Sequence, residues 1–419
     1  MFSPMRKHLK ALLTLTAGAA ALALLSPPAY ATPGYARQTG QACASCHFQH
    51  YPALNAFGRA FKAGAYTMIG GQSMIQGDDL AIPVALNAGL VTKIQYKSSN
   101  GADKTVASNT GEWKFPDEAI LLFGGRAHPN VGFATEINLD ASGADSNFDS
   151  FKVHFNNPTA GGNNLGAVIF STDGQGPGYG FELLNTGALR MQRIAEDRTA
   201  TSAQQFIGLG SGNAQGVSLV ASSNKGFVNA TFWTPDKGNV AVNGLAHYLR
   251  AALTPQLGGW DTGFGVQYFG GKAQRTNTTT GLAADKETKG WAVDAQAQGM
   301  IGTKPVGLYF TYGQAAKLSS SDSGTTSVFN TEVNEKKAWS VLGEVGVLPS
   351  RGTLMLGYRN GDNGKATKNK DNALLVGGTW MVAQNVEVQL WHTSYSGNKY
   401  DPTPAGGDNL TGLMLFMGF

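Results

Sequence analysis

The sequence is poor in cysteine, in charge and in long apolar runs. Only two of its 419 residues are cysteines, and charged residues make up 14% of the chain. From residue 81 onward no apolar run reaches 18 residues, so that part offers no candidate for a membrane-spanning helix. Setting aside three basic residues near the start leaves 29 basic residues against 28 acidic ones. This balance gives no electrostatic basis for binding nucleic acid.

Residues 1–31 have the pattern of a secretory signal peptide. Arg6, Lys7 and Lys10 form a charged start, residues 11–25 an apolar stretch, and residues 29–31 a small-residue cleavage site. An apolar stretch of about 15 residues is too short to span a membrane, which needs about 20. We therefore expect an exported protein whose mature chain starts at Thr32.

The two cysteines lie in one motif, Cys43-Ala44-Ser45-Cys46-His47. C-x-x-C-H is the attachment signature of a c-type haem, with Cys43 and Cys46 bound to the vinyl groups and His47 as the proximal iron ligand. A reversible dithiol would normally follow a strand in a βαβ unit, and none is visible. A zinc site needs further ligands at suitable spacing, and only His50 lies nearby. The motif thus predicts one covalent haem c.

The segment from residue 32 to residue 77 is predicted to be a small helical domain that carries this haem. Leu54, Phe57 and Phe61 recur at spacings of three and four residues and predict a helix with one apolar face. A segment of this length cannot bury a core of its own. It must therefore pack against its haem or against a surrounding wall.

Residues 78–419 predict an all-β transmembrane barrel. Alternating segments of about 8 to 13 residues are separated by Gly, Asn, Asp and Ser, as at residues 131–139, 307–312 and 386–391. A soluble β-sandwich would also explain this alternation. It would not explain the export signal followed by a last apolar segment that ends in Phe419. The 56 glycines and the low charge suit curved strands that face lipid.

Connections between the expected strands differ in length. Short ones occur at residues 128–130, 223–226, 302–305, 349–352 and 383–385, and long polar ones at residues 98–115, 271–289, 317–336, 360–371 and 396–409. Short turns on one rim and long loops on the other are typical of bacterial outer-membrane barrels, with the turns and both termini in the periplasm. We expect 16 strands, or 18 if residues 165–196 hold three. A barrel of this size has room for an N-terminal plug in its lumen.

A family resemblance follows from these motifs. The chain has YARQTG at residues 35–40, CHFQHYPALNAFGRAFK at residues 46–62 and YTM at residues 66–68, followed by a porin-like barrel. It resembles the fused cytochrome-porin iron oxidases of Fe(II)-oxidising bacteria. The resemblance is specific over residues 35–68, and in the barrel it extends only to architecture and length.

The resemblance implies an outer-membrane Fe(II) oxidase with one haem c. Such a protein takes electrons from extracellular Fe(II) and passes them to a periplasmic carrier such as a soluble c-type cytochrome. Three alternatives stay open: outward electron transfer to Fe(III), a porin without iron oxidase activity, and a haem-bearing receptor or sensor. The acidic residues Asp140, Asp145 and Asp149 could meet iron, although loop carboxylates usually serve solvation.

The second axial ligand of the haem iron is not given by the motif. On a helix, His50 would lie about 4.5 Å beyond His47 on the same face, so it would not reach the other side of the iron. We interpret it as a contact of the plug or of a haem propionate. Met68 is the predicted distal ligand, and the other candidates are Met74, His128 and His154. A thioether ligand raises the potential relative to a second imidazole.

Overall fold

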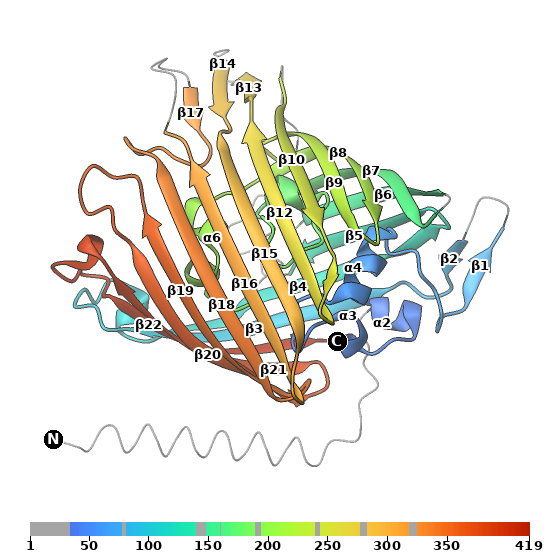
Figure 1. Ribbon diagram of the computed structural model, residues 1–419, viewed down its shortest axis with the longest axis horizontal. Coiled ribbons are helices and arrows are strands. Elements are labelled where there is room, and N and C mark those ends of the chain that lie inside the picture. Colours follow the sequence, from blue (N-terminus) through green and yellow to red (C-terminus); the bar gives the residue numbers. More distant parts are fainter. Residues whose placement is uncertain are drawn as a thin grey trace.

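The chain folds into a closed antiparallel barrel, described here from a computed structural model (Figure 1). The structure describes residues 34–77, 81–139, 148–159, 161–188, 194–238, 244–276, 283–317 and 325–419. Within these residues, 16 strands form the wall: β3 (Ala88–Ser99), β4 (Glu112–His128), β5 (Val131–Asn138), β6 (Phe148–Thr159), β7 (Asn163–Thr172), β8 (Ala214–Ser223), β9 (Gly226–Thr234), β10 (Ala246–Leu253), β12 (Trp260–Gly270), β15 (Gly290–Ile301), β16 (Lys304–Ala315), β18 (Lys336–Leu348), β19 (Gly352–Asp362), β20 (Asn372–Ala383), β21 (Val386–Ser396) and β22 (Asn409–Gly418).

Each wall strand pairs antiparallel with its neighbours in the chain, and β22 pairs with β3 to close the barrel. The short strand β11 (Gln256–Leu257) lies between β10 and β12 and pairs only with β12. The predicted all-β barrel is confirmed with the lower of the two strand counts, and the predicted haem plug stays a prediction. The described part of residues 165–196 contributes only residues 165–172, which belong to β7, and the chain then leaves the wall.

The two rims of the barrel differ as predicted. All five short connections join hairpins on one rim, the short-turn rim, where β3 begins and where Phe419 ends the chain. The five long connections lie on the opposite rim, the long-loop rim. There β13 (Lys272–Thr276), β14 (Ala283–Glu287) and β17 (Thr325–Ser327) form a small separate sheet at the top of Figure 1.

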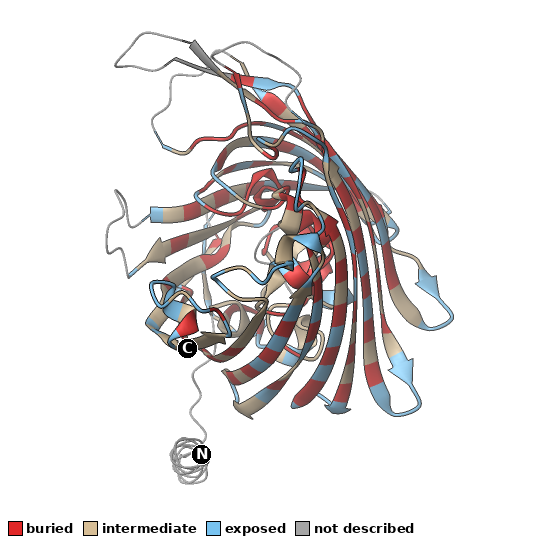
Figure 2. Ribbon diagram, turned by 90° about the vertical axis from the view of Figure 1, so that its left-hand side faces the viewer, coloured by how far each residue is buried: buried red, intermediate tan, exposed pale blue. Residues whose placement is uncertain are grey.

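Side chains of the wall alternate between buried and exposed positions, visible as stripes along the strands in Figure 2. On β18, Ser340 and Glu344 are buried, while Trp339 and Val341 are exposed. Because successive side chains of a strand point to opposite faces, the buried set faces the lumen. The outer face carries large apolar residues on nearly every strand, among them Ile169, Leu219, Phe232, Leu249, Val266, Leu308, Leu356, Val376 and Leu390.

An inserted segment, formed by the described residues between β7 and β8, occupies part of the lumen. It contains the helices η2 (Pro177–Tyr179), α5 (Arg198–Thr201) and α6 (Ala203–Ile207). Ile207 and Leu209 of this segment pack with Trp233, Tyr248 and Phe269 of the wall in one buried cluster. The lumen beside these strands therefore holds a packed apolar core.

The N-terminal segment, residues 34–77, contains three helices, namely α2 (Gly34–Thr39), α3 (Cys43–Cys46) and α4 (Ala56–Ala63). They gather at the short-turn rim (Figure 1). The strand β1 (Met74–Gln76) pairs with β2 (Ala81–Pro83), so the predicted domain boundary between residues 77 and 78 falls within one hairpin. The predicted signal peptide, residues 1–31, lies outside the described residues, as do Asp140 and Asp145. No helix among the described residues is long and apolar enough to cross a membrane.

Candidate haem site

The haem motif forms a short helix that ends before its histidine. α3 covers Cys43 to Cys46, and His47 is extended, with φ −108° and ψ 141°. His47 pairs with Leu54 in an isolated bridge, so the chain turns back directly after the motif. The sequence-based argument placed His47 and His50 on one helical face, and this geometry is wrong because the helix ends at Cys46.

The following helix, α4, is fixed against the motif by Asn55 and Gly58. The Asn55 side chain caps the helix by accepting a hydrogen bond from the Gly58 amide at 3.0 Å, and it donates to the Ser45 carbonyl at 3.0 Å. A Cβ atom on Gly58 would lie 2.2 Å from the Cys46 carbonyl oxygen. Only glycine therefore lets α4 approach α3 this closely.

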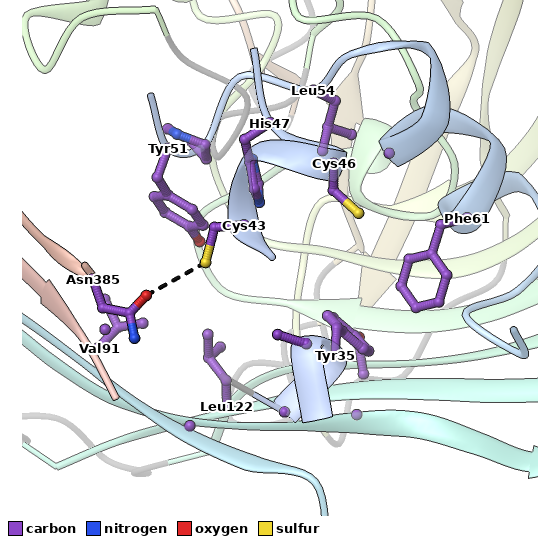
Figure 3. Close-up of a pocket in the computed structure, with 18 of the residues that line it drawn as sticks. Tyr35, Cys43, Cys46, His47, Tyr51, Leu54, Phe61, Val91, Leu122 and Asn385 are labelled. Atoms are coloured by element: carbon purple, nitrogen blue, oxygen red, sulfur yellow. Dashed lines mark hydrogen bonds between the residues drawn. The ribbon is translucent and has the colours of Figure 1, made fainter. Parts of the chain in front are cut away.

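Both cysteines and His47 line one cavity of about 540 Å³ at the short-turn end of the lumen (Figure 3). Apolar side chains form much of its wall, including Tyr35, Phe61 and Leu122. The Cys43 Sγ lies 3.4 Å from the Oδ1 of Asn385, in the turn between β20 and β21. Organic cofactors bind in largely apolar cavities of about 300–1,000 Å³, so the residues and the space fit a haem.

The electrostatics of the motif suit a ligand histidine and two free thiols. Burial lowers the pKa of His47 to about 4, against a smaller opposing effect of the Ala53 and Pro52 carbonyls. The imidazole is therefore neutral near pH 7, as an iron ligand must be. Its Nδ1 is buried and has no hydrogen-bond partner among the described residues. Burial raises the pKa of both Cys43 and Cys46, and neither forms a disulfide.

His50 holds the N-terminal segment to the barrel wall. Its Nε2 lies 2.7 Å from a carboxylate oxygen of Glu344 on β18, and its Nδ1 lies 3.1 Å from the Tyr51 carbonyl. Two acceptors require both ring nitrogens to donate, so the ring is an imidazolium. Burial opposes this charge, but Glu344 and Glu387 outweigh it and raise the pKa of His50 to about 9. His50 therefore contacts the barrel wall, and its interpretation as a contact of the plug or of a haem propionate stays a prediction.

Further contacts fix the segment around the rest of the rim. Arg59 of α4 makes two hydrogen bonds of 2.7 and 2.8 Å to the carboxylate of Asp261 on β12. The Arg37 side chain donates to the Ala88 carbonyl at the start of β3. Gln38 of α2 accepts from the Arg126 amide of β4 at 3.1 Å. The segment thus leans on the wall, as its short length requires.

The predicted distal ligand lies apart from this cavity. The Met68 side chain is 42% exposed and does not line the cavity, and its backbone carbonyl accepts from Gln38 at 2.7 Å. The other candidates do not line it either: Met74, His128 and His154. The structure therefore brings together Cys43, Cys46 and His47 but places Met68 elsewhere.

Several cavity residues come from the barrel wall and the inserted segment. The sequence patterns did not predict that these residues line the site. Glu136 of β5 and Lys152 of β6 line the cavity, as do Gln175 and Tyr179 of the inserted segment. Alternation within β5 and β6 marks Glu136 and Lys152 as inward-facing. No local signal tells which inward residues lie beside the motif, because this depends on the closure of the barrel.

Comparisons with known proteins give a similarity of overall shape only. No family model and no curated protein matches the sequence. Among solved structures, the chain is similar to OmpT, an outer-membrane protein of Vibrio cholerae, with 11% identity over 83% of this chain and 100% of that one, and a TM-score of 0.47. It is also similar to a porin, with 13% identity over 80% of this chain and 100% of that one, and a TM-score of 0.45. An OmpF of Salmonella typhi in complex with daunomycin shows 11% identity over 83% and 100% of the two chains, with a TM-score of 0.45.

Proposed function

We propose that this chain is an outer-membrane c-type cytochrome that oxidises extracellular Fe(II) and passes the electron to a periplasmic carrier. The observation that carries the proposal is the cavity at the short-turn end of the barrel. It is lined by both cysteines of the chain and by His47, the three residues that haem attachment requires.

The outer face of the barrel supports a location in outer-membrane lipid. Large apolar side chains cover it, and outward aromatic pairs gather near the long-loop rim. The rings of Trp291 and Tyr312 lie 5.2 Å apart, and those of Trp339 and Tyr358 lie 5.5 Å apart. Trp380 is exposed near the short-turn rim. Outer-membrane barrels carry such aromatic girdles where lipid meets water.

The residues of the cavity have separate tasks in this proposal. Cys43 and Cys46 would hold the haem covalently, and the neutral His47 would bind its iron. When bound, the haem supplies a one-electron redox centre whose potential depends on its ligands and on its burial. Cys43 lies next to Asn385 at the short-turn rim, so it would hold the haem at that end of the barrel. A soluble carrier on that side could dock close to it.

The chemistry of iron gives a reason for this arrangement. Fe(II) oxidised inside a cell near neutral pH would form insoluble Fe(III), so the cell gains by admitting the electron and excluding the metal. The inserted segment packs within the lumen, and the N-terminal segment bonds to wall residues at the short-turn rim. They would limit leakage of ions through the barrel.

The residue at the distal position of the iron remains part of the proposal. Met68 was predicted for it, and its ligation would require residues 67–69 to move toward the cavity, since its side chain is exposed outside it. Replacement of Met68 by Ala, followed by optical and magnetic spectra of the oxidised haem, tests this. An unchanged low-spin signal and an unchanged potential would exclude Met68.

The function is tested on purified protein in detergent. Haem staining after denaturing electrophoresis should show covalent haem, and its absence would leave a porin-like barrel without a redox role. Anaerobic Fe(II) should then reduce the oxidised haem in a spectral titration. Haem that Fe(II) does not reduce would favour a receptor, or electron flow outward to Fe(III).

The proposed orientation is tested on intact cells. A protease added outside should cut within residues 271–289 or 317–336, on the long-loop rim, and should spare the turn at residues 349–352. Cleavage at the turn alone would reverse the orientation and place the haem cavity on the outer side.

A further inference from the structure

A group of hydrogen-bond donors lies in the haem cavity apart from the cysteines. Lys152 is on β6. Four strands lie between β6 and β21, and the turn before β21 holds Asn385, which contacts Cys43. Lys152 lines the cavity together with Lys62 of α4 and Tyr179 of the inserted segment. Three different parts of the chain therefore direct donors to one region.

Lys152 is a buried lysine with no carboxylate within ion-pair distance among the described residues, although Glu136 lines the same cavity. Its side chain is buried, and its Nζ donates to the Tyr179 carbonyl at 2.9 Å and lies 4.2 Å from the centre of the Tyr179 ring. Within the described part of the chain, no carboxylate oxygen lies within 4.0 Å of this Nζ. Buried charges in proteins are normally paired, and an ammonium group has three protons to donate. The site therefore favours an added anion.

Lys62 adds a second ammonium group to the same region. Burial lowers the pKa of Lys62 to about 8, against a smaller opposing effect of Glu182. The charges of Lys62 and Lys152 repel each other, while Glu136 attracts the Lys152 charge. An anion placed between two such cations would stabilise both charges.

Two further polar groups lie beside the two lysines. The Tyr179 Oη is buried and has no hydrogen-bond partner among the described residues. Glu136, the cavity's carboxylate in this region, accepts a hydrogen bond from the Gln175 side chain at 2.9 Å. An anion here must belong to a larger apolar body, because the rest of the cavity is largely apolar. A haem has this character, since its two propionates lie on the edge opposite its vinyl groups.

We propose that Lys152 and Lys62, assisted by the Tyr179 hydroxyl, bind the haem propionates and so orient the haem and raise its reduction potential. This inference rests on the proposed function. The two lysines act as positioning residues, because they touch the propionate edge rather than the iron. Nearby positive charge favours the reduced haem, which carries one positive charge fewer than the oxidised haem.

The test uses the full-length protein with its haem, in detergent. The variants are Lys152→Gln, Lys62→Gln and the charge-retaining Lys152→Arg. Lys93→Gln is the matched control, because Lys93 is a buried luminal lysine on β3 that pairs with Glu118 at 2.5 Å and does not line the cavity. Haem content is measured first, and the midpoint potential is then measured by spectroelectrochemistry.

We expect Lys152→Gln and Lys62→Gln each to favour the oxidised haem about tenfold at a fixed applied potential, equivalent to about 59 mV for one electron. Lys152→Arg and Lys93→Gln should change this ratio less than about twofold. If Lys152→Gln does not fold, Lys62→Gln decides by the same criterion.

A shift no larger than that of Lys93→Gln, in protein with full haem content, would overturn this inference alone. The inference would also be overturned if Lys152→Arg shifted the potential as far as Lys152→Gln does. Wild-type protein without covalent haem would instead refute the proposed function.

Discussion

The inserted segment and the N-terminal segment contact the barrel wall in different ways. The inserted segment is bonded to the opposite wall at several points and packs into a continuous apolar core. Its Ala203 amide donates to the hydroxyls of Thr311 and Ser340 at 2.9 and 2.8 Å. The N-terminal segment contacts the same wall but lines much of a cavity of about 540 Å³, to which the inserted segment adds Gln175 and Tyr179. One segment mainly completes the packing of the lumen, and the other supplies the cysteines and His47 of the cavity.

The arginine ion pairs of the two segments differ in burial, although the His50–Glu344 pair of the N-terminal segment is also buried. Glu182 of the inserted segment and Asp294 of β15 both pair with Arg250 of β10, and all three side chains are 0% exposed. Arg59 of the N-terminal segment pairs with Asp261, which keeps 14% of its side-chain surface exposed. A fully buried network tolerates the loss of a partner poorly, whereas a group near the rim can be solvated by water. The comparison predicts that loss of Arg250 destabilises the barrel more than loss of Arg59 does.

The largest expected effect is on haem attachment. Replacing both Cys43 and Cys46 by Ala should remove all covalent haem, because no other thiol exists in the chain. The barrel should still insert, since its wall and inserted segment form their own contacts. Haem staining and the heat-dependent gel mobility of the folded barrel measure the two results. Haem that survives denaturing electrophoresis in the double variant would contradict the assigned attachment.

The next largest effect is expected at the buried ion-pair network. Arg250→Met should destabilise the barrel by roughly 3–5 kcal/mol, because it leaves Glu182 and Asp294 buried without their partner. Arg59→Met is the matched variant in the N-terminal segment, and it should cost about 2 kcal/mol. Urea unfolding in detergent measures both. Equal losses would show that the two segments are anchored equally.

A pH-dependent effect is expected at His50. Its pKa is raised from the ordinary value of 6.5 to about 9 in the folded protein, so its pairing with Glu344 stabilises the fold fully below about pH 6.5. This contribution, on the order of 3 kcal/mol, is lost as the pH rises through 9. Wild-type protein should thus lose more stability than His50→Gln between pH 6 and pH 10. Parallel urea midpoints for the two proteins would show that the ion pair contributes nothing.

The smallest effect is expected at Phe57. Phe57 and Phe61 share the apolar pattern of one helix, but Phe57 is 37% exposed and Phe61 only 6%. Phe57→Ala should change the local stability of α4 by less than about 0.5 kcal/mol. Phe61→Ala, which removes ring contacts to Tyr35 and Tyr66, should cost about 3 kcal/mol. Hydrogen exchange of the α4 amides measures the loss of stability in both variants. Equal losses of protection in Phe57→Ala and Phe61→Ala would contradict the structure.

Local patterns predicted much of the architecture. Strand alternation and turn residues depend on neighbours in the sequence, so the barrel, its two unequal rims and the turns that join its hairpins could be read directly. The haem motif could be read for the same reason, because its three residues lie within one short turn of chain. The prediction that one helix runs through His47 and His50 was wrong, because His47 instead forms a bridge with Leu54.

Only the tertiary structure decided what surrounds the motif. Residues 165–196 were ambiguous in the sequence because a buried segment that packs across a lumen lacks the alternation of a strand. Glu344 reaches His50, and Lys152 reaches the haem cavity, only because the sheet closes and brings strands distant in sequence around the same space. Which inward-facing residue meets which part of the N-terminal segment depends on this closure, and no local pattern in the sequence encodes it.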